Sequence, residues 1–131
     1  MRKFITGCLL GLVIGLALST SAQHNATTGR SHSKVSTVTF SATPTFDGAA
    51  TTVFKITLTG NVTSSTFSNG VAGNIYVLIV CQDSTGLRTF VYPTNWKGGV
   101  VIGSTLSTCT TQVGVYDGAN VLSTSLGLTG L

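Results

Sequence analysis

The stretch Asn74-Ile75-Tyr76-Val77-Leu78-Ile79-Val80-Cys81 is the most apolar segment of the chain beyond its first 22 residues. Successive side chains of an extended strand point to opposite faces, so this stretch presents apolar side chains on both. One face carries every second residue from Ile75 onward, and the other carries Tyr76, Leu78 and Val80. The pattern predicts a central strand, or a strand whose second face is covered by another subunit.

Residues 52–59, which precede this segment, alternate more strictly. Phe54, Ile56 and Leu58 share one face, and polar or charged residues occupy the other. This is the pattern of a strand with one buried face. Further strand-like runs lie at residues 35–40, 62–67, 88–92, 99–102, 105–115 and 121–128, and residues 42–51 are expected to form a loop.

Turn-forming residues separate these runs. Asp83-Ser84-Thr85-Gly86 predicts a hairpin turn, because Asp bonds its own backbone and Gly adopts positive φ. Residues 88–92 are then expected to return beside residues 74–81. About eight short strands at this spacing predict an all-β fold, either an antiparallel β-sandwich or a jelly-roll-like arrangement.

The composition also excludes a helical fold. Charged residues make up 8% of the chain, against ~25% in typical soluble domains. All three acidic residues are aspartates, so glutamate is absent, and strong helix formers are scarce after residue 22. Thr, Ser, Gly and Asn supply the polarity instead, which favours strands joined by tight turns.

The first 22 residues have the features of an export signal. Met1-Arg2-Lys3 is positively charged, residues 4–18 are apolar or small, and Ser19-Thr20-Ser21-Ala22 offers a cleavage site after Ala22. The apolar run is shorter than the ~20 residues that span a bilayer, which favours cleavage over the alternative, an uncleaved anchor. The sequence therefore predicts a secreted or cell-surface protein, periplasmic or extracellular.

The remaining chain divides into two parts. Residues 23–34 are polar and lack periodicity, and we expect a flexible tail there. Residues 35–131 are expected to form a single β-sandwich domain. After signal removal five Lys and Arg residues stand against three Asp, a net charge of +2, and they are scattered along the chain. No basic stripe results, so neither nucleic acid nor a membrane is expected as a partner.

Two cysteines remain in the predicted domain, Cys81 and Cys109. In an oxidising compartment such a pair predicts a disulfide, and two separate buried thiols are the alternative. Both residues fall on faces expected to point inward, so the bridge is expected to cross the core. It would stabilise the fold by about 3 to 4 kcal/mol.

The residue types that catalysis needs are sparse. His24 and His32 both lie in the predicted tail, so no Ser-His-Asp site is expected. Asp83 and Asp117 lie in turns whose chemistry accounts for them, which argues against a carboxylate pair or a calcium site. We expect no enzyme activity, no catalytic residue, no metal site and no cofactor.

Aromatic and polar residues cluster in the segment that contains Tyr92, Asn95 and Trp96. These three are the candidate binding residues, because aromatic faces flanked by polar donors bind sugars or partner proteins. Trp96 follows a loop-like Pro93-Thr94-Asn95 and is expected to be exposed. Packing of the same aromatic residues in the core is the alternative. Asp83 and Arg88 are expected to pair across the preceding turn.

Several short motifs recur in a known kind of module: Gln82-Asp83, Thr85-Gly86, Arg88-Thr89, Pro93-Thr94-Asn95, Lys97-Gly98-Gly99 and Tyr116-Asp117-Gly118-Ala119-Asn120. Through them residues 76–120 resemble a β module of phage tail-fibre and other virion surface proteins, which is also similar to stretches of small secreted bacterial proteins. This chain has Tyr92 and Val121 where those modules carry Trp and another aromatic residue. The resemblance implies a non-enzymatic structural or adhesive role, often in oligomers. The export signal favours a bacterial secreted protein over a virion component.

The leading hypothesis is therefore a secreted, non-catalytic structural or adhesive β module that acts by binding or by self-assembly. Its partner would be a second copy of itself, or a glycan or protein of a cell surface. The alternatives are a surface glycan-binding module that uses Trp96, Tyr92 and Asn95, a phage tail-fibre-like receptor-binding domain, and a small secreted hydrolase.

Overall fold

The computed structural model describes residues 34–124 and residue 130, and their fold is all-β. Eight strands follow one another in this part of the chain: β1 (Val35–Val38), β2 (Thr45–Asp47), β3 (Val53–Leu58), β4 (Thr66–Ser68), β5 (Ile75–Gln82), β6 (Trp96–Lys97), β7 (Cys109–Tyr116) and β8 (Val121–Ser123). No helix that could cross a membrane occurs among these residues. The predicted signal peptide and residues 23–33 of the predicted tail lie outside the described residues.

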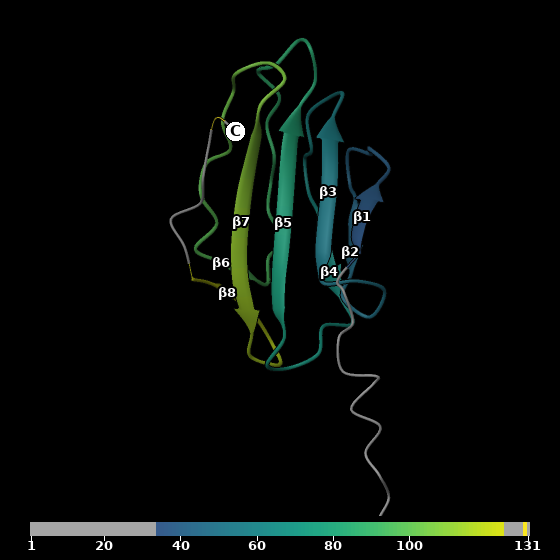
Figure 1. Ribbon diagram of the computed structural model, residues 1–131, viewed down its shortest axis with the longest axis vertical. Coiled ribbons are helices and arrows are strands. Elements are labelled where there is room, and N and C mark those ends of the chain that lie inside the picture. Colours follow the sequence, from purple (N-terminus) through teal and green to yellow (C-terminus); the bar gives the residue numbers. More distant parts are fainter. Residues whose placement is uncertain (1–33, 125–129, 131) are drawn as a thin grey trace, which may run out of the picture. The chain divides into compact units, whose positions relative to one another are not determined.

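Six of the strands form one large sheet in the order β1-β3-β5-β7-β8-β6, and β2 and β4 form a second, small sheet. The strands β1, β3, β5 and β7 lie side by side in Figure 1. The pairs β5–β7 and β7–β8 are antiparallel, as predicted. The pairs β1–β3, β3–β5, β2–β4 and β6–β8 are parallel. The antiparallel pairing predicted for the whole domain therefore holds for part of it.

The parallel pairs follow from a coiled, solenoid-like path of the chain. It runs from β1 through β2 to β3, and from β3 through β4 to β5, and so re-enters the large sheet in the same direction each time. The register pairs Val35 with Val53 and Val53 with Val77, which are offsets of 18 and then 24 residues. Because the two windings differ in length, no repeat period is visible in the sequence. The segment 42–51, expected to be a loop, contains β2.

The segment after β5 does not form the predicted hairpin. Asp83 Oδ1 accepts the N–H groups of Thr85 and Gly86, both at 2.9 Å, so the turn has the expected chemistry. The chain then passes to the inner side of the large sheet, where Phe90 forms a parallel bridge with Val62. The place beside β5 is taken by β7. Residues 99–102, also expected to be a strand, contain none.

The core lies on the inner face of the large sheet. The inward residues of β3 and β5 are buried, as their alternation predicted: Phe54, Ile56, Leu58, Tyr76, Leu78 and Val80. Phe46 of β2 and Phe67 of β4 pack onto them, with ring centroids 5.5 Å apart for Phe46 and Phe54 and 4.8 Å apart for Phe67 and Tyr76. Each buried aromatic side chain stabilises the fold by about 1.5 to 3 kcal/mol.

The prediction that Cys109, Val113 and Val115 of β7 face the core is wrong. Thr110 and Gln112 are buried, whereas Val113 and Val115 are half-buried on the outer face together with Cys109. The alternation of β7 is as expected, but the apolar set points away from the core. Polar side chains thus occupy the inner face of this strand.

Hydrogen bonds to the loop before β7 explain the inward polar residues. The Thr110 hydroxyl accepts the N–H of Gly103 at 2.8 Å, and the Gln112 side-chain carbonyl accepts the N–H of Val100 at 3.1 Å. Residues 98–108 belong to no strand, so side chains satisfy backbone groups that a neighbouring strand would otherwise satisfy. Each such bond contributes about 1 kcal/mol.

The disulfide also differs from the prediction. Cys81 and Cys109 are bonded, with an S–S distance of 2.11 Å. They are direct partners in the β5–β7 ladder and lie on its outer face, so the bridge joins neighbouring strands and does not cross the core. It closes the loop of residues 82–108 at its base. The predicted pair is correct, and the predicted inward orientation is wrong.

Candidate functional site

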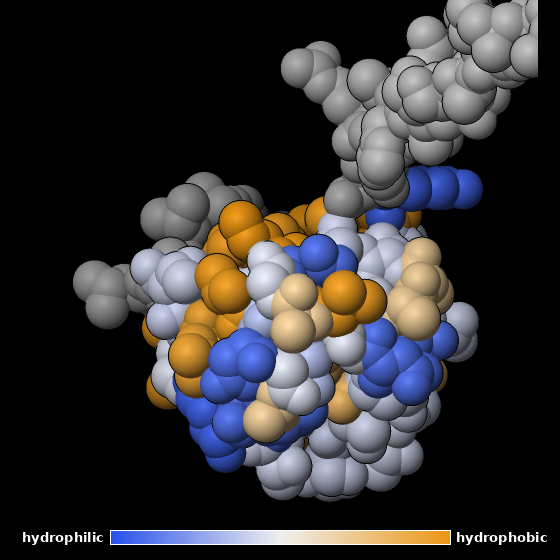
Figure 2. All heavy atoms as spheres, turned by 90° about the horizontal axis from the view of Figure 1, so that it is seen from below, coloured by the Kyte–Doolittle hydropathy of each residue, from blue (hydrophilic) through white to orange (hydrophobic). Residues whose placement is uncertain are grey.

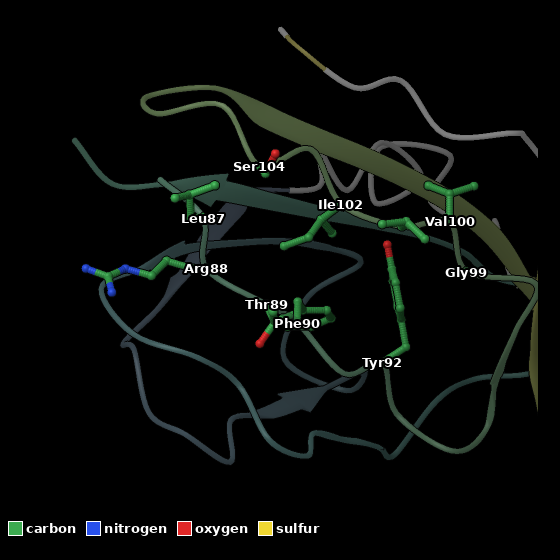
Figure 3. Close-up of a pocket in the computed structure, with 10 residues that line it drawn as sticks. Leu87, Arg88, Thr89, Phe90, Tyr92, Gly99, Val100, Ile102 and Ser104 are labelled. Atoms are coloured by element: carbon green, nitrogen blue, oxygen red, sulfur yellow. The ribbon is translucent and has the colours of Figure 1, made fainter. Parts of the chain in front are cut away.

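A pocket of about 370 Å³ lies between residues 87–92 and residues 99–104, inside the loop that the disulfide closes (Figure 3). Ten residues line it, and most of them are apolar or aromatic. They are Leu87, Arg88, Thr89, Phe90, Tyr92, Gly99, Val100, Val101, Ile102 and Ser104. The volume is in the range of small-molecule sites, roughly 300 to 1,000 Å³.

Gln82, the last residue of β5, ties the two walls of the pocket together at their base. Its side chain is buried, and its amide nitrogen donates to the carbonyl oxygens of Arg88 at 2.9 Å and Gly103 at 2.8 Å. Its side-chain oxygen accepts the N–H of Arg88 at 3.0 Å. The N–H of Leu87 donates to the carbonyl of Ser104 at 2.9 Å. The walls are thus joined although neither forms a strand.

Tyr92 is the principal polar group of the pocket. Its ring packs edge-on against Phe90, with centroids 5.1 Å apart, and its hydroxyl points toward the segment of Val100 and Ile102 (Figure 3). The hydroxyl oxygen is buried and, among the described residues, has no hydrogen-bond partner. Burial raises the pKa of Tyr92 to about 12, so the group is an uncharged O–H donor at neutral pH. Such a buried, unpaired group costs about 1 to 3 kcal/mol.

The mouth of the pocket carries exposed apolar side chains. Leu87 is 77% exposed and Val101 is 89% exposed. Leu87 has a φ of 61°, a left-handed conformation that costs a residue with a branched side chain about 1 kcal/mol or more. The fold therefore holds an apolar residue at the entrance in a strained position.

The charged groups beside the pocket neutralise each other. Arg88 Nη2 lies 3.1 Å from Asp83 Oδ2, which confirms the predicted pair. Burial would raise the pKa of Asp83, but the hydrogen bonds from Arg88 and from the backbone N–H groups of Gly86 and Thr85 outweigh it and lower that pKa. The carboxylate is therefore ionised at neutral pH, and the guanidinium beside the pocket has its charge compensated.

Of the three predicted binding residues, Tyr92 lines the pocket. Asn95 and Trp96 do not line it and bond to other parts of the fold. Trp96 is 5% exposed, and its Nε1 donates to Ser123 Oγ at 3.2 Å. The Asn95 side chain donates to the carbonyl of Phe67 at 3.2 Å. The predicted exposure of Trp96 is wrong, because β6 pairs with β8 and so draws the indole into the core. The sequence signal that was missed is the set of apolar residues from Val100 to Ile102 within a Gly- and Ser-rich loop.

The acidic residues have structural partners. Asp117 Oδ1 accepts the N–H groups of Asn120 at 2.6 Å and Ala119 at 2.8 Å, and these bonds lower the pKa of Asp117. Asp47 Oδ1 accepts the Asn69 side-chain amide at 3.0 Å. In residues 34–124 and residue 130, no three His, Cys, Asp or Glu side chains gather as metal ligands.

A second candidate surface is the outer face of the large sheet. It carries half-buried and exposed apolar side chains from five strands: Val35, Val53, Ile75, Val77, Ile79, Val113, Val115 and Leu122. Ile75, in the centre of one edge of this face, is 58% exposed. Figure 2 shows the molecule from below, so the side that faces the viewer in Figure 1 is at its top. Hydrophobic residues, in orange, gather there. We call this set of eight residues the outer apolar face.

Comparisons of the chain with protein-family models, with curated proteins and with solved structures find no match.

Proposed function

We propose that this protein is a secreted, non-catalytic structural module that assembles with further copies of itself through the outer apolar face. The observation that carries the proposal is the apolar character of a sheet face that would otherwise lie in water. Contiguous exposed apolar patches mark interaction surfaces on soluble proteins. Leu122 and Val35, at opposite sides of this face, are both exposed.

The register of the sheet arranges the outer apolar face in rows. One row is Val35, Val53, Val77 and Val113, and the next is Ile75, Val115 and Leu122. Rows of β-branched side chains on a pleated surface pack against a second sheet about 10 Å away. The main-chain groups of β3, β5 and β7 already bond to neighbouring strands of the sheet. A partner would therefore bind this face through its side chains.

The distribution of charge favours a second copy as that partner. On the outer face of β1, β3, β5 and β7 the charged side chain is Lys55, which is paired with Ile79 in the row next to the valines. A face with one cation offers no pattern for a highly charged partner. Two identical faces related by a two-fold axis match each other's valine rows.

Two further observations support export and a structural role. The disulfide is compatible with an oxidising compartment, as the predicted signal peptide requires. Asp47, Asp83 and Asp117 all accept hydrogen bonds that form turns or join loops. Turn and loop formation therefore accounts for these three carboxylates without a catalytic role.

The test is the mass of the oxidised mature protein, residues 23–131, by light scattering after size-exclusion chromatography. We expect an oligomer for the wild type and a monomer for Val113→Lys, which places a charge at the β7 end of the valine row. Thr45→Lys is the matched control, because Thr45 is exposed on strand β2, and it should leave the mass unchanged. A wild-type protein that stays monomeric at millimolar concentration contradicts the proposal.

A further inference from the structure

We propose that the free edge of β1 pairs, in antiparallel direction, with the β1 edge of a second copy of this chain across a two-fold axis at Ser36. The strand β1 lies at one end of the large sheet (Figure 1), and β3 is its partner strand among the described residues. The edge offers main-chain groups, whereas the outer apolar face offers side chains. It is therefore a second interface, beyond the one proposed above, and can be tested separately.

The strand β1 lacks the features that protect a sheet edge against strand addition. Such features are a very short strand, proline, a bulge, or a charged side chain on the edge strand. At the opposite end of the sheet order, β6 is two residues long and contains Lys97. By contrast, β1 is four residues long with the sequence Val-Ser-Thr-Val, pairs with β3 in unbroken register, and exposes Val35 and Thr37. Its edge is open to another strand.

The register of the sheet shows which main-chain groups of β1 point away from it. Val77 N–H donates to the Thr52 carbonyl, so Thr52 and every second residue after it bond toward β5. Because successive residues of a strand bond to opposite sides, Val53 bonds toward β1, to the residues on either side of its register partner Val35. Those flanking residues direct their groups at β3. The N–H and C=O groups of Val35 and Thr37 therefore point outward.

In one antiparallel register both outward residues of each copy find a partner. Val35 of each copy lies opposite Thr37 of the other, and each such pair exchanges both of its N–H···O bonds. Ser36 then lies opposite Ser36 of the second copy, on the two-fold axis. An axis perpendicular to the sheet keeps the outer faces of both copies on the same side. The outer apolar face, to which Val35 belongs, thus continues from one copy into the next.

The charges at this edge favour the antiparallel pair. Lys34, which precedes β1, is exposed, and residues 35–39 carry no charge. In the antiparallel register Lys34 lies opposite Val38 of the second copy, about 13 Å along the strand from Lys34 of that copy. This distance exceeds the Debye length of about 8 Å. A parallel pair in register would place the two lysines roughly 5 Å apart, where they repel. An uncharged edge selects its partner by hydrogen-bond register, which a second copy satisfies.

The edge is too short to hold two copies together by itself. Four residues on each side form a contact well below the about 1,000 Å² that a stable interface buries. The edge pair instead adds to an assembly in which the outer apolar faces also pack, and this step rests on the proposed function. Two edge-paired copies present their faces on one side, and a second such pair covers them. The result is a closed tetramer with two-fold symmetry.

Cysteine cross-linking of the mature protein, residues 23–131, tests the register. The two Ser36 residues form a non-hydrogen-bonded pair with Cα atoms about 4.5 Å apart, which a disulfide can bridge. Direct partners of an antiparallel ladder are already bridged in this fold, at Cys81 and Cys109. Under mild oxidation Ser36→Cys should form a covalent dimer about tenfold faster than the matched control Thr37→Cys, because the two Thr37 residues lie about 7 to 8 Å apart, beyond disulfide reach.

Light scattering tests what the edge contributes to assembly. Thr37→Pro removes an outward N–H and leaves the bonds between β1 and β3 in place, since proline is tolerated where an edge N–H faces solvent. We expect this variant to be a dimer and the wild type a tetramer, a loss of half of the mass. Thr37→Ala keeps the N–H and should keep the wild-type mass. The cross-linking experiment does not depend on the proline variant.

Three results would overturn the proposal. Slow cross-linking of both cysteine variants contradicts any pairing of the edges. Rapid cross-linking of both indicates parallel stacking in register, in which every residue lies opposite its equivalent. A folded Thr37→Pro variant of wild-type mass shows that the edge is not used. Failure of the proposed function gives a different pattern: Ser36→Cys still cross-links faster than Thr37→Cys, while Val113→Lys leaves the mass unchanged.

Discussion

Replacing Tyr92 by Phe should make the domain more stable. The substitution removes one buried oxygen that has no partner among the described residues and keeps the ring that packs on Phe90 and Trp96. A buried polar group without a partner costs about 1 to 3 kcal/mol. The gain in unfolding free energy should lie in this range, which for a domain of this size raises Tm by several degrees per kcal/mol.

The same substitution should change the alkaline limb of the stability curve. Burial raises the pKa of Tyr92 in the folded protein from 10.0 to about 12. The uncharged phenol is therefore favoured by folding, and this contribution is fully present below pH 10 and is lost as the pH rises from 10 to 12. Allowing for the partial exposure of the ring, the loss is about 1 to 2 kcal/mol. Tyr92→Phe should lack it.

Urea unfolding at pH 7 and at several values between pH 9 and 12 measures both effects. Tyr116→Phe serves as the control, because it removes a hydroxyl whose hydrogen bond to Gly118 is exposed, and it should be neutral or slightly destabilising. If Tyr92→Phe is destabilised by more than about 0.5 kcal/mol at pH 7, the hydroxyl has a partner in solution, and the argument for an unsatisfied donor in the pocket fails.

Two further predictions concern parts of the fold that support the pocket. The double variant Cys81→Ala/Cys109→Ala should lose about 3 to 4 kcal/mol of stability, measured by urea unfolding, and added reductant should lower the wild type by the same amount and leave the variant unchanged. Trp96→Ala should lose about 3 to 5 kcal/mol, because the indole is 5% exposed, whereas Thr94→Ala at a neighbouring exposed position should cost less than about 0.5 kcal/mol. A Trp96 variant of wild-type stability would show that the indole does not pack in the core in solution.

Much of the strand pattern could be predicted from local sequence. The alternation of residues 52–59 identified the buried face of β3, and the apolar character of residues 74–81 placed β5 in the middle of the sheet. Asp83 and Asp117 form turns as their chemistry suggested. Each of these features depends on residues close together in the sequence. The sequence of a single strand or turn is therefore enough to predict it.

The candidate sites were less accessible, as Trp96 and the inner face of β7 show. The context of Trp96 is loop-like in sequence, and its burial depends on the pairing of β6 with β8, more than twenty residues away. On β7 the local sequence predicts that the face with Val113 and Val115 is buried, because the other face carries Thr110 and Gln112. These two polar residues nevertheless point inward, because the loop before them needs hydrogen-bond partners. The pocket results from that same loop.

Strand periodicity and turn chemistry were thus enough to predict an all-β chain and its most buried strands, and the two cysteines left after the predicted export signal indicated the disulfide pair. Which strands are neighbours, in which direction they run and which face of β7 is buried depended on the path of the chain between layers. The physical reason is that alternation with a period of two is the same for parallel and antiparallel strands and for either face. Contacts between distant segments choose among these arrangements. They also create the outer apolar face and bury the Tyr92 hydroxyl, which has no hydrogen-bond partner among the described residues.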